Sequence, residues 1–215
     1  MRVFVTALFG LVIALLGYHG TDWLGGATAA KVSAKRPLKL GHVTQVQQNF
    51  AKISRKGLNK LITECLNQHY QYLAMANYFD RADMALPGFR KYFAASAERE
   101  YNRAKLMMEY MNKRGGTLSL MRMKAPVMFN FSQGKAALEL ALKQARQLNI
   151  KILLQNKIAM KYKDPSMKLF LDENLVDSQV ELIKQLGNFL THLELMKKSH
   201  SAGLALYMFD LELQK

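Results

Sequence analysis

Cysteine and proline are both scarce in this chain of 215 residues, which contains one cysteine and four prolines. A single cysteine excludes an internal disulfide framework and a zinc module built on paired cysteines. The low proline content excludes a collagen, and hydrophobic residues at 50% of positions exclude disorder for most of the chain. The composition therefore indicates a globular chain with a sizeable core.

Acidic residues are also few, because 16 Asp and Glu stand against 31 Lys and Arg, for a net charge of +15. Such an excess indicates an anionic partner, a partner protein of opposite charge, or a scattered basic surface. No helix-turn-helix, RNA-binding or zinc motif accompanies the charge, and the basic residues are spread along the chain. The charge balance alone therefore does not predict nucleic-acid binding.

Residues 1–30 have the pattern of a secretory signal peptide. One positive charge at Arg2 precedes an apolar run from Val3 to Tyr18, which is shorter than the roughly 20 residues needed to span a bilayer. Small residues follow, and cleavage near Ala29 or Ala30 fits them. We therefore expect a mature chain with no membrane span, in the secretory pathway or outside the cell. An uncleaved signal anchor is the alternative. The sequon at Asn130 would be usable only in that pathway.

The rest of the chain predicts an all-α fold. After a basic, flexible arm at 31–47, the 3.6-residue period of amphipathic helices dominates and strand-type alternation is absent. The irregular segment 117–133 is long for a connection and would let four long helices run up-down-down-up. We therefore expect one domain, 48–215: a four-helix bundle with a long crossover between helices 2 and 3. The predicted helices are 50–80, 87–114, 134–163, a fourth opening at Asp164-Pro165, and a short fifth at 202–212.

Polar residues inside the apolar stripes are the candidate functional residues. Glu100 and Arg103 share one face of the second helix, where a Glu-x-x-His pair in a four-helix bundle would bind iron. Arginine has no lone pair to offer a metal ion. We therefore expect the two side chains to neutralise each other's charge and to occupy the space that a metal ion would take. A metal site is the alternative. We expect His69 to be a core or half-buried histidine, and Cys65 a small buried hydrophobic residue.

Several short segments between 48 and 213 form one specific pattern. They are Tyr70-Gln71-Tyr72-Leu73-Ala74-Met75, Tyr78-Phe79-Asp80-Arg81-Ala82-Asp83, Arg114-Gly115-Gly116, Asp164-Pro165, Gly203-Leu204-Ala205 and Tyr207-Met208-Phe209-Asp210. On these segments the chain resembles ferritin from 48 to 213. The resemblance implies a ferritin-like four-helix bundle, a shell of 24 subunits, an iron mineral inside, and a fifth helix that lines four-fold channels. With its N-terminal signal, the chain is similar to the secreted ferritins of invertebrates.

The same resemblance implies that this chain is a light-type subunit and not an enzyme. Catalytic ferritin chains oxidise ferrous iron at a di-iron centre made of glutamates, a histidine and supporting residues. The ungapped match implies that the supporting tyrosine, one glutamate and the glutamine are kept, while the remaining ligands are lost. The matching residues are Tyr72, Glu100 and Gln179 for the kept positions, and Cys65, Arg103 and Ala145 for the lost ones.

Other positions depart from light-type subunits. The resemblance implies a cluster of glutamates on the cavity face of the second helix and acidic residues in the three-fold channel. The cavity-face positions read Ala95, Glu98, Arg99, Asn102 and Lys105, and the channel positions read Leu169 and Asp172, beside Lys168. Fewer acidic groups should attract cations less strongly. The candidate metal-binding residues are Glu100, Gln179, Glu98 and Asp172.

The sequence supports three hypotheses. The first is an iron-storage shell subunit without a ferroxidase centre, in a homo- or hetero-oligomer with other ferritin chains and most simply beside a catalytic one. The second is a ferritin-derived shell repurposed as a carrier or chaperone-like particle with a basic lumen and little iron. The third is a residual enzyme that uses relocated ligands such as His69 and Glu100.

Overall fold

The computed structural model describes residues 44–127, 131 and 134–215. The expected signal peptide, most of the expected arm, and Asn130 and Ser132 of the sequon lie outside the described residues. All described residues belong to one compact unit.

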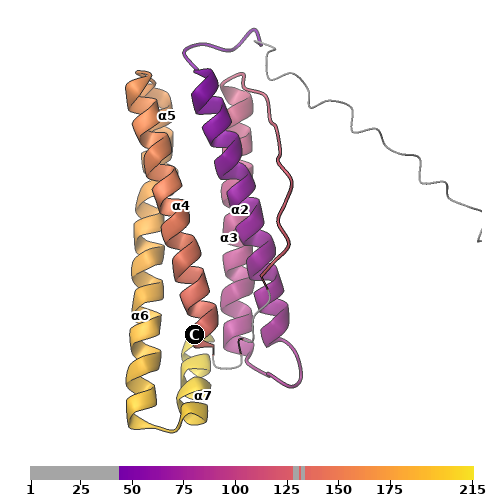
Figure 1. Ribbon diagram of the computed structural model, residues 1–215, viewed down its shortest axis with the longest axis vertical. Helices are drawn as coiled ribbons and strands as arrows, with labels where there is room; N and C mark the ends of the chain where they lie inside the picture. Colours follow the sequence, from indigo (N-terminus) through magenta and orange to yellow (C-terminus); the bar gives the residue numbers. More distant parts are fainter. Residues whose placement is uncertain (1–43, 128–130, 132–133) are drawn as a thin grey trace, which may run out of the picture. The chain divides into compact units, whose positions relative to one another are not determined.

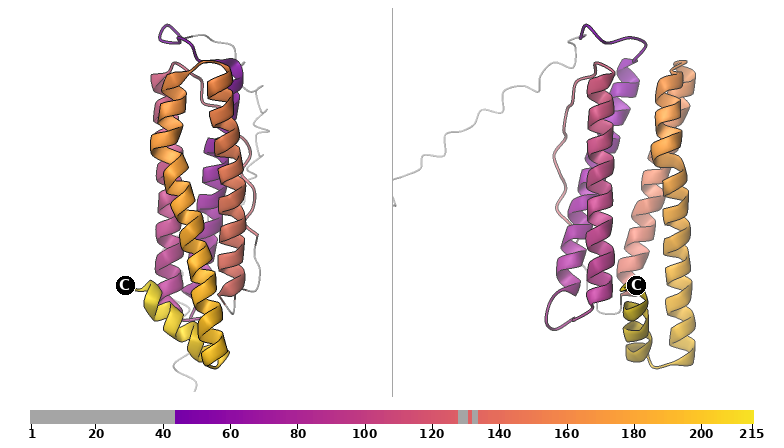
Figure 2. Two further views of the ribbon diagram at one scale, coloured as in Figure 1. Left: turned by 90° about the vertical axis from the view of Figure 1, so that its left-hand side faces the viewer. Right: turned by 180° about the vertical axis from the view of Figure 1, so that it is seen from behind.

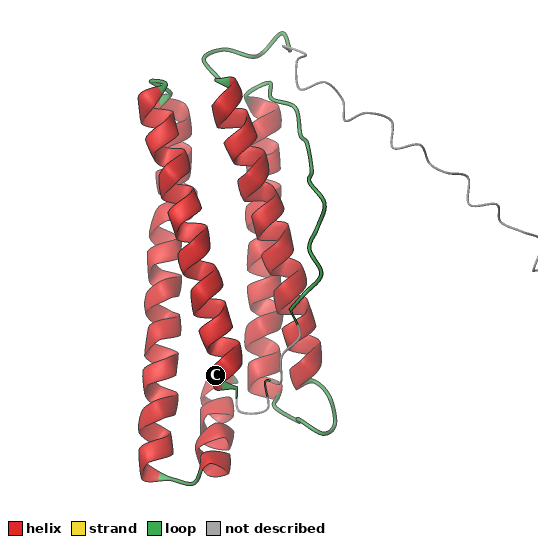
Figure 3. Ribbon diagram, in the orientation of Figure 1, coloured by secondary structure: helices red, strands yellow, loops and turns green. Residues whose placement is uncertain are grey.

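The regular secondary structure of the described residues is entirely helical (Figures 1 and 3). Two antiparallel pairs of long helices form the bundle, and the short last helix packs at one end against α3 and α6 (Figure 2). The predicted all-α architecture, with its crossover and fifth helix, is confirmed. No helix in the described ranges is long and apolar enough to cross a membrane. The elements are α2 (Lys52–Phe79), α3 (Pro87–Lys113), α4 (Lys135–Lys161), α5 (Pro165–Leu171), η1 (Asp172–Val176), α6 (Asp177–Ser199) and α7 (Ala202–Leu213).

Proline, aspartate and glycine residues mark the points where the helices begin and end. Pro87 and Pro165 occupy first turns, where the missing N–H is not needed. The Asp164 carboxylate accepts a hydrogen bond from the Met167 N–H at 3.0 Å, which caps α5. Gly115 follows the end of α3 with φ of 71°, a left-handed conformation that glycine adopts without strain. The sequence signals predicted these ends correctly.

The hydrophobic core consists of two clusters, one toward each end of the bundle. On α3 the first cluster extends to Ala97 and the second begins at Ala104. Phe79 and Phe93 are among the stacked aromatic rings of the first cluster, and Leu58 belongs to the second. Burial of each such side chain contributes about 1.5–3 kcal/mol. Between Ala97 and Ala104, where neither cluster reaches, α3 carries two buried charged residues, Glu100 and Arg103.

Four polar side chains on α2 hold the crossover along that helix (Figure 1). Asn59, Thr63, Asn67 and Gln71 recur every four residues, so they form a continuous stripe that winds slowly around α2. The Asn59 Oδ1 accepts from the Ser119 N–H at 2.8 Å, and the Asn67 Oδ1 accepts from the Lys124 N–H at 3.0 Å. The Gln71 amide forms two bonds with the Val127 backbone, at 2.7 and 3.0 Å. We call these four residues the crossover ladder.

A π-helical turn, η1, joins α5 to α6 in one continuous helix. A π-turn leaves carbonyl groups imperfectly paired, and polar side chains engage some of them here. The Asn174 Nδ2 donates to the Phe170 carbonyl at 2.8 Å, and the Ser178 hydroxyl donates to the Leu175 carbonyl at 3.2 Å. The sequence analysis predicted a helix here but not its π-turn.

The last helix, α7, is anchored to the start of α3 by a buried carboxylate. The Asp210 Oδ1 accepts a hydrogen bond from the Phe89 N–H at 2.9 Å, which satisfies a backbone group that the first turn of α3 leaves free. A Cβ atom on Gly88 would lie 2.0 Å from the Asp210 carbonyl oxygen. The close approach of the two helices therefore requires glycine at this position.

Candidate functional site

The buried polar groups where the two core clusters meet form the candidate site. Glu100 and Arg103 come from α3, Gln179 from α6, and Cys65 and Tyr72 from α2. Each of them is buried, and the Glu100 and Gln179 side chains have no exposed surface. We call these five residues the polar layer.

The Arg103 guanidinium connects the groups of this layer. Its Nη1 donates to the Glu100 Oε1 at 3.0 Å and to the Gln179 Oε1 at 2.7 Å. Its Nη2 donates to the Ser178 hydroxyl at 2.9 Å, and the Gln179 Nε2 donates to the Ala145 carbonyl at 2.7 Å. The expected contact between Glu100 and Arg103 is present. An arginine stays protonated at any physiological pH, so the Glu100 charge has a permanent partner.

Two oxygen atoms of the layer remain without a hydrogen-bond partner, the Glu100 Oε2 and the Tyr72 hydroxyl. Burial, and then the nearby Glu100 carboxylate, raise the pKa of the Tyr72 phenol far above its usual value. The same two causes raise the pKa of the Cys65 thiol. Both groups are therefore neutral at physiological pH. Cys65 is buried, as expected for a small hydrophobic residue.

The four predicted metal-binding residues occupy three places. Glu100 and Gln179 lie together but are joined through Arg103. Glu98 is exposed and accepts a hydrogen bond from the Asn102 amide at 3.1 Å. Asp172 lies in η1, where the Lys168 ammonium at 2.6 Å is the first cause that lowers the pKa of its carboxyl. In the described ranges, no three His, Cys, Asp or Glu side chains are placed to share a metal ion.

His69, the other candidate ligand, lies outside this chain of contacts. Its Nδ1 is 2.9 Å from the Ala97 carbonyl oxygen, and its ring lies beside the Tyr101 ring. Its side chain is half-buried, as expected. A carbonyl partner favours the tautomer with a proton on Nδ1.

The sequence analysis missed Ser178, which binds the Arg103 guanidinium. Ser178 falls outside the apolar stripe of its helix, so the periodicity assigned it to solvent. Its position next to Gln179, just after a helix segment rich in Asp and Asn, was the only signal available.

The sequence matches the family model described as Ferritin-like domain over residues 55–196. The chain belongs to the ferritin family. The matched residues of this ferritin begin in α2 and end in α6, so they include the four long helices and the whole polar layer.

Individual ferritins match over most of their own length. Soma ferritin of Lymnaea stagnalis is 37% identical over 170 residues, which are 79% of this chain and 95% of that protein. The ferritin lower subunit of Aquarana catesbeiana is 36% identical over 167 residues, 78% of this chain and 96% of that protein. The oocyte isoform of the ferritin light chain of Xenopus laevis is 35% identical over 167 residues, with 78% and 94% covered. This ferritin is thus similar to chains of the lower and light type.

Proposed function

We propose that this chain is a non-catalytic iron-storage subunit that builds shells together with a catalytic ferritin chain. The observation that carries the proposal is the position of the Arg103 guanidinium, 3.0 Å from Glu100 and 2.7 Å from Gln179. These are the carboxylate and the amide of the polar layer, and the remaining oxygen, the Tyr72 phenol, stays protonated because its pKa is raised. The carboxylate and the amide both already accept hydrogen bonds from a cation.

A di-iron centre does not fit this donor set. Such a centre needs several carboxylates to balance the charge of two metal ions. The polar layer contains one carboxylate, Glu100, whose charge Arg103 already neutralises. At the other ligand positions implied by the resemblance, Cys65 is a buried thiol with a raised pKa and Ala145 has no donor atom. These residues support a buried structural core at the position where a catalytic chain has its ferroxidase centre.

Charge favours mixed shells. The net charge of +15 would oppose close packing of identical subunits and would favour an acidic partner chain. The signal-like segment 1–30 supports a location of this chain, and so of its partner, in the secretory pathway. In such a shell, the partner would oxidise ferrous iron and this chain would contribute wall and cavity surface.

Ferrous-iron oxidation by the pure protein tests the proposal. We expect oxidation in air to be no faster with wild-type protein than in buffer alone, and faster after co-assembly with a catalytic chain. The triple variant Cys65→Glu, Arg103→His, Ala145→Glu should gain activity, because it restores the donors that the resemblance implies. Arg90→His is the matched control on α3, because Arg90 is exposed and pairs with Asp80.

Fast oxidation by the wild-type protein that is lost in Glu100→Ala would overturn the proposal in favour of a residual enzyme. Iron and phosphorus analysis of the native particle tests the remaining alternative. Iron in large excess over subunits supports storage, whereas a particle with phosphorus and almost no iron would show a carrier of polyanions instead.

A further inference from the structure

An apolar groove lies between α2 and α4 on the surface of the bundle. Its volume is about 600 Å³, within the usual range of roughly 300–1,000 Å³ for small-molecule sites. The side chains of Ile53, Met121 and Leu154 are 44%, 47% and 58% exposed, so a ligand in the groove would touch them directly. Leu61 and Ile158 line the same groove more deeply. Apolar side chains gathered in one hollow indicate a binding site, unlike apolar residues scattered singly over a surface.

A glycine and a fixed amide lie where the two helices approach most closely under the groove. A Cβ atom on Gly57 would collide with the Gln155 Oε1, so this position requires a residue without a side chain. The Gln155 Nε2 donates to the Ser54 carbonyl at 3.0 Å, which holds the amide in place. Both Gly57 and Gln155 line the groove, and its shape is therefore set by helix packing and not by mobile side chains.

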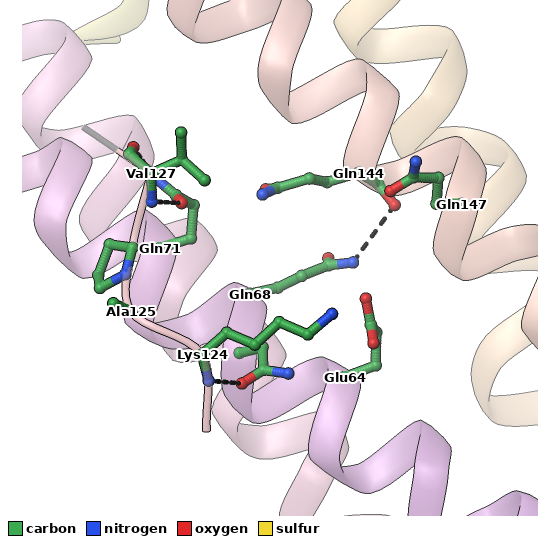
Figure 4. Close-up of a pocket in the computed structure, with 10 residues that line it drawn as sticks. Glu64, Gln68, Gln71, Lys124, Ala125, Val127, Gln144 and Gln147 are labelled. Carbon is green, nitrogen blue, oxygen red and sulfur yellow. Dashed lines mark hydrogen bonds between the residues drawn. The ribbon is translucent and has the colours of Figure 1, made fainter. Parts of the chain in front are cut away.

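An ion pair closes one end of the groove. The Glu64 carboxylate and the Lys151 ammonium are 2.8 Å apart and connect α2 to α4. Glu64 also lines the next pocket, toward the end of the crossover, which is smaller and mostly polar (Figure 4). From Glu64 back to Ile53 the groove follows α2 for about 16 Å, at 1.5 Å per residue. One extended hydrocarbon chain can lie along this length.

Three lysines border the groove along α2, and we call them the lysine row. Lys52, Lys56 and Lys60 follow one another at intervals of four residues, so consecutive ammonium groups are neighbours on the helix surface. Lys56 and Lys60 line the groove, and Lys52 lines a smaller hollow that adjoins it. Within the described ranges, no carboxylate lies within ion-pair distance of any of the three. Like charges at this spacing repel one another, so a bound anion would stabilise them.

The apolar groove and the lysine row together define one class of ligand. We propose that the groove binds a single-chain lipid phosphate, with its hydrocarbon chain on the apolar side chains and its phosphate between Lys56 and Lys60. A phosphate monoester has a charge of about −1.5 to −2 at pH 7, which matches two unpaired ammonium groups better than the single charge of a carboxylate. An extended chain advances about 1.2 Å per bond, so about ten carbons and the phosphate fit the groove. This inference does not depend on iron storage or on loss of catalysis.

Other ligands satisfy only part of this surface. Inorganic phosphate or a polyanion would pair with the lysine row but would leave the apolar side chains in contact with water. A neutral apolar molecule would cover those side chains and leave the ammonium groups unpaired. A metal ion is repelled by the lysine row, and the carboxylate that lines the groove, Glu64, is already neutralised by Lys151.

Equilibrium dialysis of decyl phosphate against the assembled protein, below the concentration at which this ligand forms micelles, tests the site. We expect saturable binding that is tighter than that of decanol, decanoate or inorganic phosphate. The double variant Lys56→Gln, Lys60→Gln should weaken decyl phosphate binding about tenfold at low salt and leave decanol binding unchanged. Lys184→Gln is the matched control, because Lys184 is exposed on α6 and does not line the groove.

A second pair of variants tests the apolar half of the site. Leu154→Ser should weaken the binding of decyl phosphate and of decanol alike, each about fivefold, because it removes apolar surface that the chain would cover. Leu153→Ser changes the neighbouring residue, which does not line the groove, and should leave both affinities unchanged. Both leucines are exposed, so neither change disturbs the core.

Three results would overturn the proposal. They are no saturable binding of decyl phosphate, equal affinity for decyl phosphate and inorganic phosphate, and equal affinity of wild type and the double lysine variant for decyl phosphate. Sedimentation of the protein with vesicles that contain phosphatidate, without binding of monomeric decyl phosphate, would also overturn it and assign the surface to a membrane.

Discussion

Two arginine–carboxylate pairs with buried carboxylates differ in how completely their hydrogen-bonding atoms are satisfied. At the end of the bundle, Arg114 donates from both Nη atoms to the two Asp164 oxygens at 3.0 Å, and Asp164 also caps α5 through Met167. In the polar layer, the Arg103 Nη1 is shared between two acceptors, and the Glu100 Oε2 has no partner. One pair is saturated, and the other retains unused capacity.

The difference separates a pair that holds chain segments together, Arg114–Asp164, from a pair whose carboxylate keeps an unpaired buried oxygen, Arg103–Glu100. Arg114 also donates to the Asn49 carbonyl and lies 4.9 Å from the Phe50 ring centre, so it joins the segment before α2 to the ends of α3 and α5. Bidentate pairs of this kind hold chain segments in one geometry. A core carboxylate with an unpaired oxygen contributes little to stability, which is why its retention calls for another explanation.

Loss of the arginine from the polar layer should have the largest effect. Arg103→Ala leaves the buried Glu100 carboxylate with only the partly exposed Arg99 guanidinium, whose Nε lies 3.4 Å from the Glu100 Oε1, and we expect it to lower the free energy of unfolding by about 3 kcal/mol. The double variant Glu100→Leu, Arg103→Met should be much closer to wild type, because no charge remains. Thermal and urea unfolding measure both. Arg103→Ala that melts like wild type would show that the two side chains are not buried together.

Loss of the saturated pair should have a smaller effect. Arg114→Met removes both hydrogen bonds to Asp164, but that carboxylate keeps the Met167 N–H as a donor. We expect a loss of about 1–3 kcal/mol in the free energy of unfolding. A larger loss of unfolding free energy for Arg114→Met than for Arg103→Ala in urea would contradict this order of the two pairs.

Alkaline pH should weaken the polar layer selectively. The folded-state pKa values of Tyr72 and Cys65 are raised, so unfolding releases their protons above the ordinary values of 10.0 and 9.0. Stability is therefore intact below pH 9 and falls as pH rises, by about 1.4 kcal/mol per pH unit for each group. Unfolding curves between pH 8 and 11 should be flatter for Cys65→Ala and Tyr72→Phe. Tyr101→Phe, which alters a partly exposed ring, should retain the wild-type slope.

The crossover ladder contains no charged side chain, and loss of one of its hydrogen-bonding groups should have the smallest effect on stability. Gln71→Leu removes two neutral hydrogen bonds to Val127 and should lower the free energy of unfolding by about 1 kcal/mol, because water can reach the exposed Val127. Amide hydrogen exchange at Val127 should accelerate, while exchange in α6 stays unchanged. Equal acceleration in both regions would show that the ladder supports the whole bundle and not only the crossover.

The sequence predicted what depends on near neighbours. Pro87 and Asp164 marked helix starts, and the i, i+3 spacing of Glu100 and Arg103 predicted their contact. The Arg114–Asp164 pair joins residues 50 positions apart, and no periodicity encodes such a contact. The four-residue spacing from Asn59 to Gln71 was visible in the sequence, but a polar stripe on a helix normally faces water. Only the tertiary fold shows that it faces the crossover backbone.

The π-turn at η1 keeps two helix segments in phase with one core. Met167, Leu171, Leu175 and Gln179 are all buried and follow one another at intervals of four residues. A regular helix repeats every 3.6 residues, so three such intervals would rotate the buried stripe by about 120°. The π-turn absorbs that surplus, and Gln179 therefore faces Arg103 while Leu171 still faces the core. A single deletion between 172 and 176 should therefore give a regular helix in which the glutamine still faces the guanidinium, because the shortened interval from Met167 is close to three regular turns.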